Sequence, residues 1–142
     1  MLAGHLALTI AAMFTGAAFY VGFAEQPARL QLDDRAQLAQ WKPSYTRGFA
    51  MQGTLAVAGF LLGALQWWQS GDGLWLLGAL LLVANWPFTL FVIMPTNKAL
   101  MATPTDAAGA GSRLLVVKWG PLHAVRTALG AAATLVFLWA AT

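Results

Sequence analysis

Residues 74–94 read LWLLGALLLVANWPFTLFVIM, a run of 21 residues without a charged side chain. A helix needs about 20 predominantly apolar residues to cross the hydrocarbon core of a bilayer. The run also lacks the regular alternation of apolar and polar residues that is typical of a strand in a membrane barrel. It therefore predicts a transmembrane helix.

Three further stretches of the chain are similarly long and apolar. The four predicted spans cover about residues 3–25, 45–68, 74–94 and 114–140. The chain of 142 residues is 59% hydrophobic and only 9% charged, which is too apolar for a soluble domain. We therefore expect an all-α fold, an integral membrane four-helix bundle that forms one domain over residues 1–142. Gly59 and Gly63 are spaced for close helix packing within the bilayer.

The segment after the first span predicts a short amphipathic helix on the membrane surface, over about residues 28–40. Pro27 would start this helix or kink the chain, and Pro43 and Ser44 would form a turn that caps the second span. The sequence shows no repeat, and the spans do not divide into similar halves.

Two prolines shape the expected third span. Pro87 predicts a bend, where Asn85 and Thr89 could bond the backbone groups that the proline leaves unpaired. Pro95 predicts the end of the helix, and Asn97 either caps that end or donates a hydrogen bond into a site.

Basic residues gather at two of the three connections and set the expected orientation. They flank residues 26–44 and 96–113, whereas the turn at 69–73 has no Lys or Arg. Because basic loops stay on the cytoplasmic side, both termini should face outward, in a bacterial inner membrane. Orientation explains these charges better than phosphate binding, so we expect no nucleic-acid partner.

Cysteine and histidine limit the possible cofactors. The chain has no cysteine, which excludes disulfides, iron–sulfur clusters and cysteine nucleophiles. Its two histidines, His5 and His123, fall at opposite ends of their predicted spans, so they cannot share a haem or a metal ion. We therefore expect no haem and no bound metal ion.

Trp119, His123 and Arg126 form a polar stripe on the last span. Their spacing of i, i+4 and i+7 places them on one helix face, which continues into small residues and predicts a cavity. A charge at mid-helix costs about 2.5–3.5 kcal/mol on insertion scales and usually has a named partner. Glu25 is the expected partner of Arg126, and the alternative is that Glu25 binds Arg29 one turn away.

Several short motifs together resemble a known family. They are Gly16 to Tyr20, Glu25 to Arg29, Trp41 with Tyr45, Pro95 to Asn97 with Leu100, and Trp119 through His123 to Arg126. The pattern resembles the anthrone oxygenase-like family of small four-span membrane proteins. That resemblance implies oxidation of a hydroxyanthrone-type polyketide to an anthraquinone by O2, without flavin or metal.

The resemblance also implies roles for the polar residues. His123 would act as the base, since a histidine titrates near physiological pH, and Arg126 with Asn97 would stabilise the enolate oxygen. Glu25 would hold Arg126 or His123, and it completes the expected catalytic set.

Trp119 would stack on the flat substrate, and Arg29 is also expected to bind it. The expected ligand is an apolar aromatic or quinone-like molecule that enters from the membrane lipid into an inner-leaflet pocket. The alternative function is a non-enzymatic membrane protein that binds a lipid, a quinone or a protein partner through Glu25, Asn97, His123 and Arg126.

Overall fold

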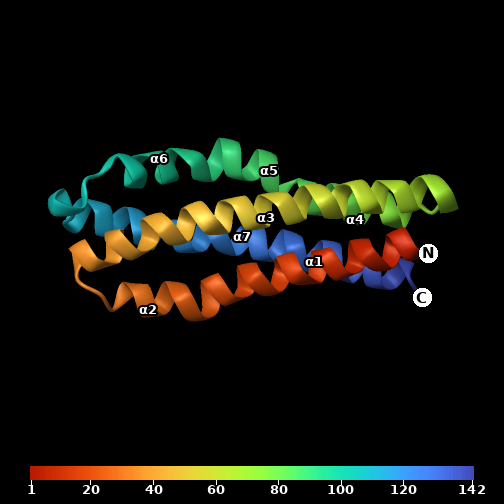
Figure 1. Cartoon of the computed structure of the whole chain (residues 1–142), viewed down its shortest axis with the longest axis horizontal. Coiled ribbons are helices and arrows are strands. Elements are labelled where there is room, and N and C mark those ends of the chain that lie inside the picture. The colour runs from red at the N-terminus through yellow and green to blue at the C-terminus, as the bar shows by residue number, and fades with distance from the viewer.

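The protein folds as a bundle of four long helices that run side by side, with both termini at one end (Figure 1). The structure, a computed structural model, describes residues 1–142. The four helices, each long and apolar enough to cross a membrane, are Leu2–Leu30, Asp34–Ser70, Gly73–Ala102 and Ala110–Ala140, called here the first to fourth spans. The expected all-α membrane bundle is confirmed.

The first and third spans are interrupted helices, whereas the second and fourth are continuous. The first span comprises α1 (Leu2–Tyr20), a π-helix (Val21–Glu25) and α2 (Gln26–Leu30), and the second span is α3 (Asp34–Ser70). The third comprises α4 (Gly73–Val83), α5 (Asn85–Phe88), a π-helix (Thr89–Ile93) and α6 (Met94–Ala102). A 3₁₀ turn (Thr105–Ala107) precedes α7 (Ala110–Ala140), which is the fourth span.

The expected separate surface helix over residues 28–40 is wrong. Its first residues complete the first span, and α3 starts at Asp34, where the Asp33 side chain accepts a hydrogen bond from the Ala36 N–H at 2.8 Å. The helix then continues through Pro43, which therefore forms no turn. The rings of Trp41 and Tyr45 stack at 4.8 Å on either side of the proline, and this packing offsets the backbone hydrogen bond that Pro43 cannot make.

The third span bends near Pro87, but Pro95 does not end it. The Asn85 side chain donates to the Leu82 carbonyl oxygen at 3.0 Å, as expected of a residue that satisfies backbone groups near the bend. The Thr89 hydroxyl has no partner. Pro95 lies in the first turn of α6, where a missing N–H costs little, so the helix continues to Ala102.

Each π-helix precedes a proline. A proline ring clashes with the carbonyl group four residues earlier, which belongs to Phe23 for Pro27 and to Phe91 for Pro95. Phe23 and Phe91 are the middle residues of the two π-helices. The wider π-helical turn accommodates each proline without ending its span.

The two halves of the bundle share a pattern of elements that forms a weak internal repeat: a π-helix before a proline in the first and third spans, and a long helix with an internal proline in the second and fourth. In the first and third spans, corresponding residues differ by 68 in number; the pairs are Ala7 and Trp75, Ala11 and Ala79, Phe14 and Leu82, Pro27 and Pro95, and Arg29 and Asn97. In the second and fourth spans they differ by 78; the pairs are Leu38 and Val116, Trp41 and Trp119, Pro43 and Pro121, and Gln52 and Gly130. Corresponding spans run in the same direction, as in parallel repeats related by an axis along the membrane normal.

Small residues let the spans approach closely in the half of the bundle near the termini. A Cβ atom on Gly78 would lie 2.6 Å from the Phe137 ring, and one on Gly130 would lie 2.7 Å from the Phe14 ring. Phe14 and Phe137 belong to a first apolar core in this half, and in the half opposite the termini a second core contains Trp41, Trp119 and neighbouring aliphatic side chains. In every span except the first, polar buried residues lie between the two cores.

Candidate functional site

The layer between the two cores contains polar side chains without partners. This polar layer comprises Gln52, Asn85, Thr89, His123 and Arg126, each no more than 8% exposed. Each residue in it has a buried nitrogen or oxygen atom with no hydrogen bond. Because leaving one such group unpaired costs about 1–3 kcal/mol, five of them together mark this layer as a candidate functional site.

His123 is held in one orientation. Its Nε2 lies 3.2 Å from the Ala18 carbonyl oxygen, and because a carbonyl can only accept, Nε2 carries the proton in this hydrogen bond. The ring also stacks on Trp119, with centroids 4.7 Å apart and planes at 18°. The remaining nitrogen, Nδ1, is then an unprotonated acceptor without a partner. This arrangement suits a base.

A groove of about 520 Å³ lies between the first and fourth spans, beside His123. Its aromatic wall contains Phe19 and Phe23, which stack at 5.2 Å, and Trp119. Its floor contains residues with small side chains, namely Gly22, Gly120, Ala124, Ala128 and Ala131. The volume is within the usual range of about 300–1,000 Å³ for small-molecule sites. Phe23 is 73% exposed, so the groove opens to the outer surface of the bundle.

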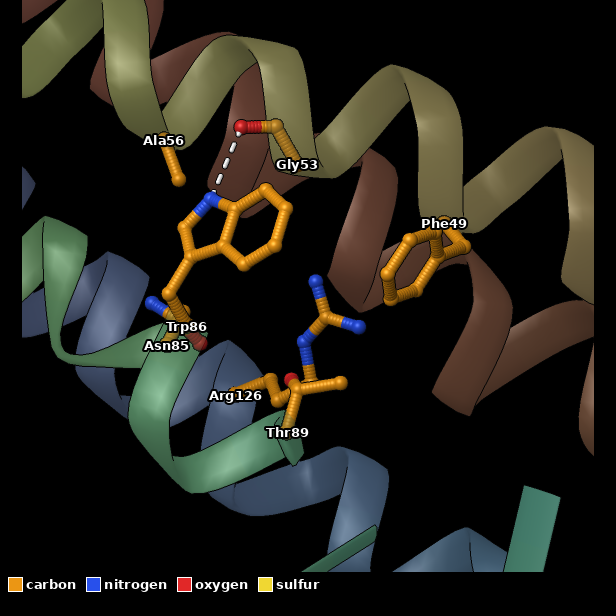
Figure 2. A pocket seen from close by; sticks show the side chains of 7 residues that line it. All are labelled: Phe49, Gly53, Ala56, Asn85, Trp86, Thr89 and Arg126. Carbon is orange, nitrogen blue, oxygen red and sulfur yellow. Dashed lines mark hydrogen bonds between the residues drawn. The ribbon is translucent and has the colours of Figure 1, made fainter. Parts of the chain in front are cut away.

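Arg126 does not pair with Glu25, and that expectation is wrong. No carboxylate forms an ion pair with Arg126, whose guanidinium group lies 5.7 Å from the Phe14 ring centroid. In Figure 2 the guanidinium group points into a small cavity among Phe49, Trp86 and Thr89. It is therefore a buried cation without a counterion.

Glu25 instead binds Arg29, which is the alternative that the sequence left open. The Arg29 Nη2 atom lies 2.7 Å from the Glu25 carboxylate, which also accepts from Gln40 at 3.0 Å and from Ser44. Glu25 and Arg29 are one turn apart on the same helix, which makes this pair local. Arg126 belongs to the polar layer, which lies deeper in the bundle. The Glu25 side chain therefore binds the nearer Arg29, Gln40 and Ser44 side chains.

Arg29 and Asn97 meet at Trp119. The Arg29 guanidinium carbon lies 5.6 Å from the Trp119 ring centroid, and the Trp119 indole N–H donates to the Asn97 side-chain oxygen at 3.0 Å. Neither residue lines the groove, whereas Trp119 does. Glu25, Arg29 and Asn97 therefore fix the position of Trp119, and Trp119 in turn packs on His123.

Sequence reasoning missed two polar residues that line the groove. Gln26 donates to the Val116 carbonyl oxygen at 2.8 Å and accepts from Arg29 at 2.9 Å, which ties the first span to the fourth. Thr127 lines the groove with a hydroxyl that makes no hydrogen bond within the protein. It lies one turn beyond His123 on the same face, and that spacing could have identified it.

The two halves of the bundle differ at the groove. Trp86 corresponds to Ala18, and Phe49 corresponds to Thr127. Between the second and third spans the Trp86 indole packs on Phe49 at 5.8 Å and donates to the Gly53 carbonyl oxygen at 3.1 Å. That region leaves a cavity of only about 10 Å³, so large side chains close the space that is open in the other half.

These features define a small integral membrane protein in which a four-span bundle encloses a polar layer beside a lateral groove. Residues 41–136 match the anthrone oxygenase family. The chain belongs to this family.

Two relatives support the assignment to this family. The chain is 32% identical over 140 residues to a protein named anthrone oxygenase from Claviceps purpurea, an alignment that covers 87% of this chain and 79% of the relative. It is 35% identical over 108 residues to anthrone oxygenase tpcL from Aspergillus fumigatus, covering 68% of this chain and 67% of the relative. No solved structure matches the chain.

Proposed function

We propose that this protein is a cofactor-independent oxygenase that oxidises a flat, apolar, hydroxyanthrone-like or quinone-like molecule with O2. The observation that carries the proposal is the unpartnered Nδ1 atom of His123 beside a groove of about 520 Å³ with aromatic walls. The relatives named anthrone oxygenases support the same class of reaction.

The chemistry requires little beyond a base and a dry pocket. An anthrone has an acidic C–H group opposite its ketone, and removal of that proton gives an electron-rich enolate that can reduce O2 directly. His123 Nδ1 takes the proton, a step that typically contributes about 10²–10⁴ in rate. The groove faces lipid, so an apolar substrate enters it from the bilayer.

The substrate needs an aromatic platform and a hydrogen-bond donor. Trp119 supplies the platform, fixed by Asn97 and Arg29, so these two residues position the site without contacting the substrate. We assign the hydrogen bond to the enolate oxygen to Thr127, because Thr127 lines the groove and Arg126 does not. Glu25 acts through Arg29.

The decisive experiment measures anthraquinone formation and O2 consumption by the purified protein in nanodiscs with a hydroxyanthrone, above the rate of oxidation without protein. We expect His123→Ala to lower the catalysed rate by about 10²-fold or more. His5→Ala, at an exposed position, is the matched control and should leave the rate unchanged.

A second pair of variants tests the groove itself. Gly22 lines it and Gly16 does not, and added Cβ atoms at both positions would meet no atom within 4 Å. Gly22→Phe should therefore abolish turnover while Gly16→Phe keeps it, with both proteins folded. Full activity in His123→Ala would disprove the base, and full activity in Gly22→Phe would disprove the substrate site.

A further inference from the structure

Arg126 borders two small cavities on the interior side of His123. One, of about 20 Å³, is lined by Tyr45, Gln52, Trp119, His123 and Arg126 among others. The second, of about 10 Å³, is shown in Figure 2 and is lined by Asn85, Thr89 and Arg126 among others. The guanidinium group makes no hydrogen bond to any side chain or carbonyl group, and it has no counterion. Its donors are therefore free for a ligand.

Size limits what these cavities can hold. A cavity needs about 10–15 Å³ of accessible volume to contain one water molecule. The larger cavity therefore admits a molecule of one or two heavy atoms, and no aromatic substrate fits in it.

Charge limits the ligand further. A buried, unpaired cation favours an anion or a molecule that becomes one, and such stabilisation is strong where water is excluded. In the proposed reaction, the molecule with two heavy atoms that gains negative charge is O2. The cavity also shares Trp119 and His123 with the groove, so the two sites adjoin.

We propose that the cavity beside Arg126 binds dioxygen, and that the guanidinium group stabilises the superoxide formed there. The inference rests on the proposed function and assigns Arg126 to the oxygen rather than to the enolate.

The electron balance of this step is complete with O2 as the only oxidant. The enolate transfers one electron to O2, which gives a substrate radical and superoxide next to Arg126. These combine through a new C–O bond to form a peroxide anion, which takes a proton from the His123 imidazolium. The hydroperoxide then loses water, with the second hydrogen of the same carbon, so that a CH2 group and O2 become a carbonyl group and H2O.

The test separates proton removal from the reaction with oxygen. Without O2, exchange of the acidic C–H of a hydroxyanthrone with D2O reports on enolate formation, which the proposed function assigns to His123 and Thr127 and not to Arg126. We expect Arg126→Met to keep the wild-type exchange rate but to lower the O2-dependent rate by about 10²–10³-fold. We expect Arg126→Lys to recover part of the O2-dependent rate, because it retains the charge. Arg47→Met, at an exposed position, is the control and should leave both rates unchanged.

The possible outcomes are distinct. If Arg126→Met loses exchange and oxidation in equal proportion, then Arg126 acts on the enolate and the inference is overturned. An unchanged O2-dependent rate in Arg126→Met would also overturn it. If the wild-type protein catalyses neither exchange nor oxidation, the proposed function itself fails, and that result is visible before any arginine variant is made.

Discussion

Replacing Trp119 with Phe should destabilise the bundle by about 2 kcal/mol more than the same replacement of Trp41, although the two residues are equivalent in the two halves. Both side chains are buried, with exposed fractions of 6% and 0%, and their rings are 6.1 Å apart. Both variants lose the same atoms, so the packing costs largely cancel. The expected difference in stability between the two variants therefore comes from the indole N–H groups that they lose.

The magnitude follows from the partners of those two groups. The Trp119 N–H donates to Asn97, and a hydrogen bond between membrane helices contributes on average about 0.6 kcal/mol and at most about 1.7 kcal/mol. The Trp41 N–H has no partner, so its removal relieves a penalty of about 1–3 kcal/mol. Added together, these two effects give a difference of about 2 kcal/mol.

Equilibrium unfolding of the two variants in mixed detergent micelles measures this difference. Activity provides a second measure, because Trp119 stacks on His123 and Trp41 does not. We therefore expect Trp119→Phe to lower turnover and Trp41→Phe to preserve most of it. If Trp41→Phe is as destabilising as Trp119→Phe, the assigned hydrogen-bond partners are wrong.

Two further predictions concern packing and orientation. Gly78→Ala should destabilise the protein by about 1–3 kcal/mol in the same unfolding assay, because its Cβ would lie 2.6 Å from the buried Phe137 ring. Gly16→Ala, where the space is open, should not, and equal effects would contradict the close packing. Because the chain has no cysteine, single cysteines introduced at Thr142 and Asp106 can be labelled selectively. Only Thr142→Cys should react with an impermeant reagent added outside cells, and labelling of Asp106→Cys alone would reverse the orientation.

The sequence was sufficient to predict the four spans and the family. Length and apolar composition determine whether a helix can cross a bilayer, and the helical periodicity placed Trp119, His123 and Arg126 on one face. All three are buried in the structure. The aromatic and polar roles proposed for them remain predictions until activity is measured.

Partners between spans were harder to predict. Glu25 binds Arg29 on its own helix and not Arg126. Which of the two arginines it binds depends on how deep each side chain lies in the bundle, and helical periodicity does not give that depth. The sequence also gave no reason to expect α3 to continue through Pro43, because the stabilising Trp41 and Tyr45 stack appears only in the folded helix. The repeat, in contrast, was detectable: Trp and Pro occur two residues apart at Trp41 and again at Trp119.

The repeat explains why the site lies on one side of the bundle. The two halves share two pairs of prolines, Pro27 with Pro95 and Pro43 with Pro121, as well as their π-helices and the Trp41 and Trp119 positions, so the common scaffold alone would produce two similar spaces. Trp86 and Phe49 close one of them. In the other, Thr127 stands in place of Phe49 and lines the open groove, and Ala18 stands in place of Trp86 and offers its carbonyl oxygen to His123. A large side chain at Gly22 should therefore fill the groove, as Trp86 and Phe49 fill the corresponding space between the second and third spans, and it should abolish turnover.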